Sequence, residues 1–253
     1  MQDLAALRFP DHHDEVLRAL NEIGNPKLAE HIPKDRRSAL VYAGVKVPVR
    51  RALGKKGFSF YDQSEQKTLT IWHDLFMHST NGDVLFCAMD FLRFRVPKHV
   101  PKDLWPHIRD WITRIENWAH ADELSWIYSY VLEAHFDHVY PDLLEWNEQA
   151  DLWPKRVSIV SLIHYTGKNA VFLPPDVVLP MVRRCMEDHR YYMQKATGWV
   201  LREMHRAYPE EIESFLTEHL GAIGADALSR SVEKMHKEER QRWREARVKA
   251  QTT

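Results

Sequence analysis

Pro175-Asp-Val-Val-Leu179 opens an amphipathic segment, and similar segments open at Pro141-Asp-Leu-Leu144 and Pro209-Glu-Glu-Ile212, each 34 residues away. A proline in the first turn of a helix costs little, because the hydrogen bond it cannot donate is not needed there, and a following acid favours the positive helix end. Pro101-Lys-Asp-Leu104 is a looser copy, 40 residues before Pro141. A regular period of helix-opening signals predicts stacked helical repeats.

A second apolar-periodic segment follows each of these openings, over 119–136, 153–167, 190–207 and 225–249. Paired helices at this period are typical of α-solenoids such as HEAT and TPR proteins. The Trp and Gly-Tyr pattern that defines a TPR is absent, which favours the HEAT type. We therefore predict an all-α fold, a HEAT-like α-solenoid of antiparallel helix pairs whose inner helices line one concave face.

Apolar residues recur at three- and four-residue spacing through the rest of the chain as well. The nine further helices that we expect cover 11–23, 26–42, 48–56, 65–79, 83–95, 102–115, 141–149, 175–187 and 209–220. No strand or hairpin is expected, and only nine glycines agree with a fold that has few tight β-turns. We expect a single domain over 1–253, with 1–20 and 240–253 peripheral, and interpret the charged last helix as a solvated cap.

The composition sets broad limits on function. The 35 basic and 36 acidic residues give a net charge of −1, so any nucleic-acid surface must come from segregating charge onto one face. Two distant cysteines make neither a disulfide scaffold nor a four-cysteine zinc site, which indicates a reducing compartment. No signal-peptide pattern opens the chain and no apolar run is long enough for a membrane span, so we expect a cytoplasmic protein without membrane partners.

Three segments bring together residues with chemical potential. They are Asn117-Trp-Ala-His-Ala-Asp122, Trp153-Pro-Lys-Arg156 and the helical segment 194–203, which contains Gly198 and Trp199. Each also has an ordinary interpretation, since tryptophans at helical spacing usually pack in the core and acids often cap helices. Gly198 stands out because a mid-helix glycine costs about 1 kcal/mol relative to alanine. Either a ligand or a packed helix therefore passes close to the backbone there.

Five ordered blocks resemble the AlkD-like family of DNA alkylation repair proteins. Tyr191–Met204 (YYMQKATGWVLREM) resembles the family's signature helix, and Tyr42–Arg51 resembles its G-[IV]-x-x-P-x-x-R segment. Ile71–Leu75 is similar to its Leu-Trp helix, and the segments at 117–122 and 153–156 follow in the family's order and spacing. The resemblance spans about residues 25–235.

The resemblance implies a function and a set of site residues. The family's two sugar-facing tryptophans match Trp118 and Trp199, its catalytic aspartate matches Asp122, and its phosphate-contacting arginine matches Arg156. Ala119-His120 departs from the family pattern, which we expect to affect substrate range rather than activity. The implied enzyme is a monofunctional glycosylase that removes N3- and N7-alkylated purines, such as 3-methyladenine and 7-methylguanine, from double-stranded DNA in base excision repair.

This chemistry suits the residues. An alkylated purine is already cationic, so no general acid is needed for its departure, unlike in sugar hydrolases with two carboxylates. Asp122 would stabilise positive charge on the deoxyribose and place a water, while each indole face would contribute roughly 0.5–2 kcal/mol. We expect no cofactor, and no metal, because the spacing of His135 and His138 is not that of a zinc helix. Candidate phosphate contacts are Lys155, Lys195, Arg202, Arg183, Arg184 and Arg190.

Two other functions remain open from the sequence. One is a non-catalytic binder of branched or damaged DNA, and the other is a HEAT-like protein–protein scaffold. A protein–protein scaffold would not need the combination of Trp118, Asp122, Arg156 and Trp199. The presence of all four residues also argues against a non-catalytic binder. We expect a monomer, since a solenoid that ends in a polar helix leaves no apolar end face exposed.

Overall fold

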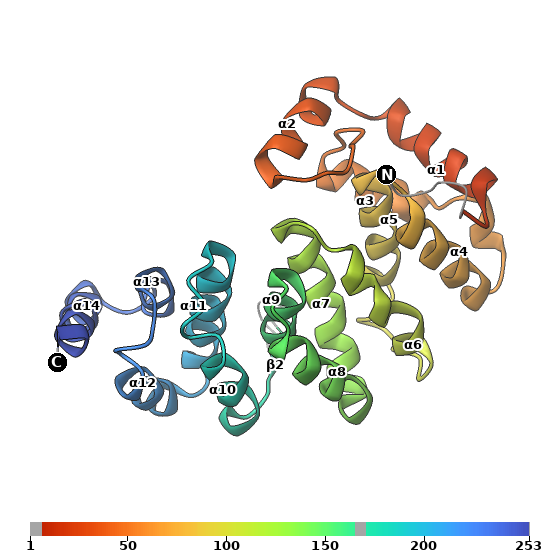
Figure 1. Cartoon of the computed structure of the whole chain (residues 1–253). Helices are drawn as coiled ribbons and strands as arrows, with labels where there is room; N and C mark the ends of the chain where they lie inside the picture. The colour runs from red at the N-terminus through yellow and green to blue at the C-terminus, as the bar shows by residue number, and fades with distance from the viewer. Residues whose placement is uncertain (1–6, 165–170, 253) are drawn as a thin grey trace. The chain divides into compact units, whose positions relative to one another are not determined.

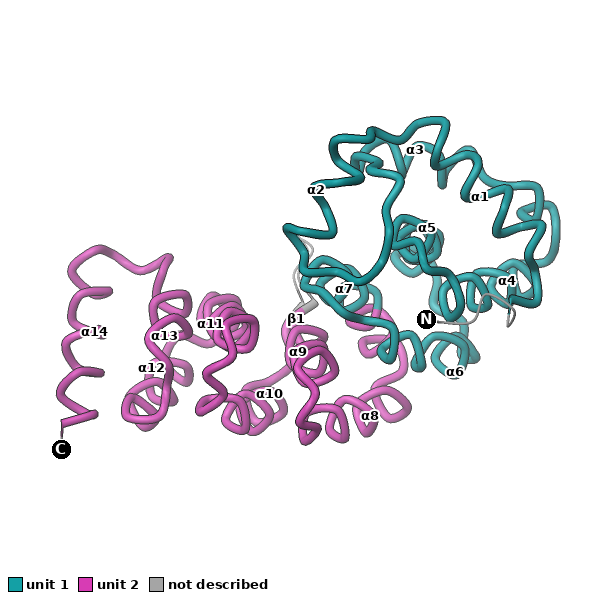
Figure 2. The backbone as a smooth tube through the Cα atoms, turned by 45° about the horizontal axis from the view of Figure 1, so that its top comes forward, with its two compact units in different colours: residues 1–127 teal, residues 128–253 magenta. Residues whose placement is uncertain are grey.

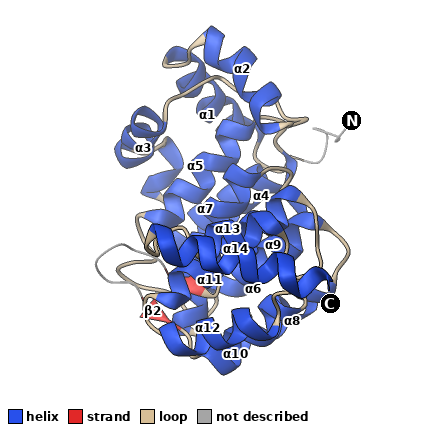
Figure 3. Cartoon of the chain, turned by 90° about the vertical axis from the view of Figure 1, so that its left-hand side faces the viewer, coloured by secondary structure: helices blue, strands red, loops and turns tan. Residues whose placement is uncertain are grey.

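The computed structural model describes residues 7–164 and 171–252, and α-helices make up most of that range (Figure 3). The predicted all-α class and helical-repeat architecture are confirmed. The prediction that the chain has no strand is wrong at one place, where β1 (Ile163–His164) and β2 (Val171–Phe172) form a short antiparallel pair. The helix expected over 153–167 ends at Val160, and residues 165–167 lie outside the described range.

Two compact units divide the chain, Met1–Ile127 and Tyr128–Thr253 (Figure 2). The prediction of one domain over 1–253 therefore stays a prediction, and each unit is described by itself. None of the helices in the described range has the length and apolar character that a bilayer span requires.

The first unit is built around one buried helix. Its elements are α1 (Pro10–Glu22), α2 (Pro26–Arg36), α3 (Val47–Lys56), η2 (Ser59–Asp62), α4 (Glu65–His78), α5 (Gly82–Arg93), α6 (Leu104–Ile108), η3 (Arg109–Arg114) and the start of α7 (Trp118–Ala134). Every α5 residue from Gly82 to Leu92 is buried, and α1, α3 and α4 pack around it (Figure 2). An all-round apolar sequence such as VLFCAMDFL is what a central helix requires.

Two helices of this unit are shorter than predicted. The helix expected over 26–42 ends at Arg36, because Arg37 adopts a left-handed conformation with φ of 53° and the amide of Ser38 turns back to the carbonyl of Pro33. The helix expected over 102–115 is a short α-helix followed by the 3₁₀-helix η3.

The second unit shows the repeat most clearly. After α7 come α8 (Phe136–Glu148), α9 (Leu152–Val160), α10 (Pro175–Arg183), α11 (Tyr191–His205), α12 (Pro209–Glu218), α13 (Ala225–Ser231) and α14 (Lys237–Thr252), as Figure 1 shows. We call α9, α11 and α13 the inner helices, because α11 packs against both others, and α8, α10 and α12 the outer helices. Pro175 and Pro209 begin α10 and α12 as predicted.

Further boundaries in the second unit also differ from the prediction. Pro141 lies inside α8 rather than at its start, since the helix extends back to Phe136, whose ring stacks on Tyr140 at 4.6 Å. The helix expected over 225–249 is two helices, α13 and α14. Glu239 closes the start of α14 by accepting a 3.0 Å hydrogen bond from the amide of His236, as in a capping box.

Candidate active site

Asn117 determines where α7 begins. Its side-chain oxygen accepts hydrogen bonds from the amides of Ala119 and His120, both at 3.1 Å. This is the bonding of an N-cap residue, which satisfies amide hydrogens that have no partner within the helix. Trp118 therefore lies in the first turn of α7, on a start that is fixed by a fully buried side chain.

Trp118 and Asp122 share the outward face of this part of α7. Positions four apart differ by about 40° around a helix, whereas positions two apart differ by about 200°. The Trp118 residue is 38 % exposed and Asp122 is half-buried, while His120 between them is 0 % exposed. The first indole is therefore accessible from solvent, as the predicted role in sugar contact requires.

His120, one of the two residues that depart from the family pattern, belongs to the core of the first unit and does not lie on the face that carries Trp118. Its ring lies 4.6 Å from that of Phe86 and 6.4 Å from that of Tyr42. The amide nitrogen of Asn117 can only donate, so Nδ1 of His120 accepts this 3.0 Å hydrogen bond and the ring is neutral. Burial lowers the pKa of His120 to about 3. Any effect of His120 on substrate range is therefore indirect.

An ionic network holds the next turn of α7 against α3 and α5. Glu123, next to Asp122, accepts from Arg93 at 2.8 Å and from Arg51 at 3.3 Å. The guanidinium of Arg51 also contacts Asp90 at 3.2 Å, and Asp90 is fully buried. Arg51 is the last residue of the segment 42–51, so this segment helps to hold the first turns of α7 in place.

Trp126 extends the Trp118 face and was missed by the sequence analysis. It lies four residues beyond Asp122, and the Arg93 guanidinium lies 4.0 Å from the centre of its ring. The signal was present as tryptophan, aspartate and tryptophan at successive four-residue intervals. The first unit therefore offers two indoles flanking one carboxylate on a single helical face.

In the second unit, Arg156 and Trp199 lie on adjacent inner helices. The residue Arg156 is 4 % exposed, and its guanidinium donates a hydrogen bond to the backbone carbonyl of Tyr192, which ties α9 to α11. Trp199 is half-buried on α11. The predicted phosphate contact of Arg156 stays a prediction, and the structure shows an interhelical contact for the same side chain.

Gly198 is explained by a packed helix. A Cβ atom at Gly198 would lie 2.4 Å from the carbonyl oxygen of Ala227 and 2.7 Å from Cβ of Arg230. Both belong to α13, so the absent side chain lets α11 and α13 approach closely. Of the two explanations open from the sequence, the structure supplies the neighbouring helix.

Two of the predicted phosphate contacts are partly exposed lysines on the inner helices. Lys155 is half-buried on α9. Lys195 is half-buried on α11, one turn before Trp199, and its ammonium lies 4.5 Å from the centre of the Tyr191 ring.

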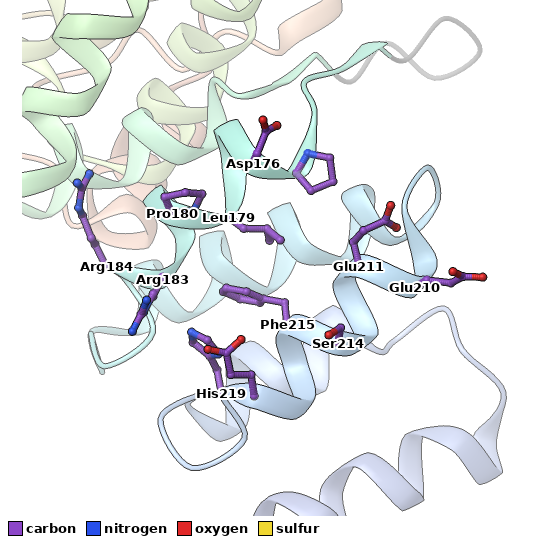
Figure 4. Close-up of a pocket in the computed structure, with 12 residues that line it drawn as sticks. Asp176, Leu179, Pro180, Arg183, Arg184, Glu210, Glu211, Ser214, Phe215 and His219 are labelled. Carbon is purple, nitrogen blue, oxygen red and sulfur yellow. The ribbon is translucent and has the colours of Figure 1, made fainter.

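The other four candidates are placed differently. Arg202 is held between Glu203 at 2.7 Å and Glu233 at 2.9 Å. Arg190, at the start of α11, pairs with Asp188 at 2.6 Å. Arg183 and Arg184 lie at the end of the outer helix α10, where they line a groove of about 830 Å³ shared with α12 (Figure 4). The structure therefore does not bring these two together with Lys155 and Lys195.

The four proposed catalytic residues are divided between the units. Trp118 and Asp122 belong to the first unit, and Arg156 and Trp199 to the second. Their convergence on one sugar stays a prediction. Within the described residues no group of three or more His, Cys, Asp or Glu side chains is placed to hold a metal ion.

Comparison with known proteins gives a consistent result. The model of a family described as "DNA alkylation repair enzyme" matches residues 16–239. A predicted DNA alkylation repair enzyme from Enterococcus faecalis has a similar fold, with a TM-score of 0.70 at 17 % identity over 85 % of this chain and 97 % of that one. AlkD2 from Streptococcus mutans gives a TM-score of 0.50 at 15 % identity over 88 % and 97 %. No curated protein matches the chain significantly.

Proposed function

This chain belongs to the family of DNA alkylation repair enzymes, whose model matches residues 16–239, and on that premise we propose that it is a monofunctional DNA glycosylase. The proposed reaction is hydrolysis of the N-glycosidic bond of a cationic N3- or N7-alkylated purine in double-stranded DNA. The membership supports a role in the repair of alkylated DNA. The lesions, 3-methyladenine and 7-methylguanine, and the place in base excision repair are part of the proposal.

The observation that carries the proposal is the exposed face of α7. An indole that is 38 % exposed and a carboxylate one turn further on face the same way, on a helix start fixed by Asn117. When the bond between sugar and base lengthens, positive charge develops on the deoxyribose and the base leaves as a neutral molecule. Asp122 would stabilise that charge and orient the attacking water. The face of Trp118 would stabilise it further through cation–π attraction.

The second unit would supply the remaining contacts. Trp199 would face the sugar from α11, and Arg156 would contact a phosphate beside the lesion. Because Arg156 also bonds the carbonyl of Tyr192, its replacement would loosen α11 as well as remove a phosphate contact. Lys155 and Lys195 would contact neighbouring phosphates.

The test is release of free base from methylated duplex DNA by the wild type and by Asp122→Asn. This variant keeps the size of the side chain and removes its charge, so release should fall at least about tenfold while affinity for the duplex is kept. Asp137→Asn is the matched control, because Asp137 is an exposed acid in the first turn of α8. Its rate should equal that of the wild type.

Three outcomes separate the possible functions. Base release that is unaffected by Asp122→Asn would remove the proposed role of the carboxylate. Tight binding of branched DNA without base release would favour a non-catalytic binder. No affinity for DNA, with a protein partner whose binding is insensitive to salt, would favour a scaffold.

A further inference from the structure

A row of three side chains runs along one face of α11. Tyr191, Lys195 and Trp199 are each four residues apart, so they lie one above another on the helix. Tyr191 is 53 % exposed, which is unusual for an aromatic residue, and the ammonium of Lys195 lies 4.5 Å from the centre of its ring. The row leads from the proposed sugar contact at Trp199 to the N-terminal end of α11.

At that end of α11 the structure contains a groove of about 310 Å³ between α11, α13 and α14, which we call the α14 groove. Its charged lining consists of Lys195, Arg230, Arg240, Arg244, Asp226 and Glu233. The four cations outnumber the two carboxylates, in a chain whose net charge is −1. Tyr191 forms part of the same wall.

The charges of the α14 groove are arranged to leave donors for an anion. Glu233 is already bound by Arg202 at 2.9 Å and by Arg230 at 3.5 Å, so the charges of Glu233 and Arg230 largely cancel. Three cations of the lining then remain against one carboxylate, Asp226. Nε of Arg240 is buried and has no hydrogen-bond partner in the described part of the chain. Arg244 makes a long 3.4 Å contact with the hydroxyl of Ser229. A buried guanidinium donor without an acceptor is costly unless a ligand supplies one.

We infer that the α14 groove holds the sugar–phosphate backbone of a DNA strand that flanks the lesion. Arg240 and Arg244 donate to phosphate oxygens, and the exposed ring of Tyr191 packs on a deoxyribose. This inference rests on the proposed function and extends its DNA contacts beyond the inner helices. It makes α14 part of the DNA interface instead of the solvated cap that its sequence suggests.

The experiment measures the affinity for an undamaged duplex as a function of KCl concentration, for the wild type and for single variants that each remove one positive charge. Loss of one phosphate contact makes the slope of log K against log[salt] shallower by about 0.9, and weakens binding roughly eightfold at 0.1 M salt. We expect this for Arg240→Gln and Arg244→Gln. Tyr191→Ala should weaken binding and leave the slope unchanged, because it removes no charge.

Arg242→Gln is the matched control. Arg242 is on the same helix and carries the same charge, but its side chain is 76 % exposed and it does not line the α14 groove. Its slope should equal that of the wild type. Thermal melts followed by circular dichroism identify any variant that fails to fold, and the second arginine variant then carries the test.

Base release by the wild type is measured in parallel, so that the two proposals fail separately. The α14 groove is not a DNA contact if both arginine variants keep the wild-type slope, or if Arg242→Gln changes the slope as much as they do. If the wild type releases base in that case, the glycosylase proposal stands. If the two variants lose slope and the wild type releases no base, the groove is a DNA contact and the glycosylase proposal fails.

Discussion

Replacement of Gly198 by alanine should destabilise the second unit, against the usual effect of this change in a helix. The new Cβ atom would lie 2.4 Å from the carbonyl oxygen of Ala227 and 2.7 Å from Cβ of Arg230. Neither atom can rotate away, because one belongs to the backbone and the other is the first side-chain carbon. Relief therefore requires α11 and α13 to separate.

The size of the effect follows from two opposing contributions. Overpacking of a well-filled interface costs about 1–3 kcal/mol. Alanine regains about 1 kcal/mol of intrinsic helix preference over glycine. Because the contact is with backbone, the cost should lie in the upper part of its range, and the net loss is about 1–2 kcal/mol. For a chain of this size that lowers the melting temperature by about 2–8 °C.

Gly54→Ala is the control for this prediction. Gly54 lies in α3, and a Cβ atom there would meet nothing closer than the ring of Phe94 at 3.8 Å and Cβ of Asp90 at 3.9 Å. These are ordinary contacts, so this variant should gain up to about 1 kcal/mol. The assay is urea unfolding followed by tryptophan fluorescence. The unfolding transition of each variant is compared with that of the wild type, for the second unit in Gly198→Ala and for the first unit in Gly54→Ala. If Gly198→Ala stabilises the protein as Gly54→Ala does, the close packing of α11 on α13 is wrong.

Four further variants test individual contacts. Glu123→Gln should lower the free energy of unfolding by about 1–3 kcal/mol, because Arg93 loses its carboxylate partner and Arg51 loses one of its two. An unchanged urea midpoint would contradict this. The pKa of buried His120 is about 3, below the unfolded value of 6.5. The unfolded state therefore binds a proton that the native state does not, and stability falls by up to about 1.4 kcal/mol per pH unit as pH drops from 6.5 towards 3. His120→Gln should remove that part of the pH dependence, and unchanged slopes in urea unfolding between pH 4 and 6 would refute it. Arg202→Gln should lower the melting temperature without changing the salt slope of DNA binding, whereas Lys195→Gln should make that slope shallower by about 0.9 with little change in melting.

The repeat was predictable because its signals are local. A proline followed by an acid specifies a helix start from backbone chemistry alone, and α10 and α12 begin at Pro175 and Pro209 as expected. The boundaries that differ depend on contacts between distant residues or on single backbone angles. Val139 in the early part of α8 is fully buried, which favours helix upstream of Pro141. The left-handed conformation of Arg37 leaves no periodic signal in the sequence.

The candidate site was predictable to a similar degree. The shared face of Trp118 and Asp122 follows from four-residue spacing on a helix, and Trp118 is exposed in the structure. The environment of Arg202 was not predictable, since its partner Glu233 is 31 residues further along the chain. The same holds for Arg183, whose position in a groove with α12 depends on how successive outer helices stack.

The net charge of −1 left DNA binding undecided, and the arrangement of ion pairs explains why. Arg50 pairs with the buried Asp90 at 2.7 Å, Arg190 pairs with Asp188 at 2.6 Å, and Arg202 pairs with two glutamates. Each such pair contributes nothing to the net charge and little to the field outside the protein. The local field at a phosphate backbone is therefore set by the few cations that face it, as we propose for the α14 groove. A steep salt dependence of binding in this nearly neutral protein would be evidence for such a local surface, because net charge cannot produce it.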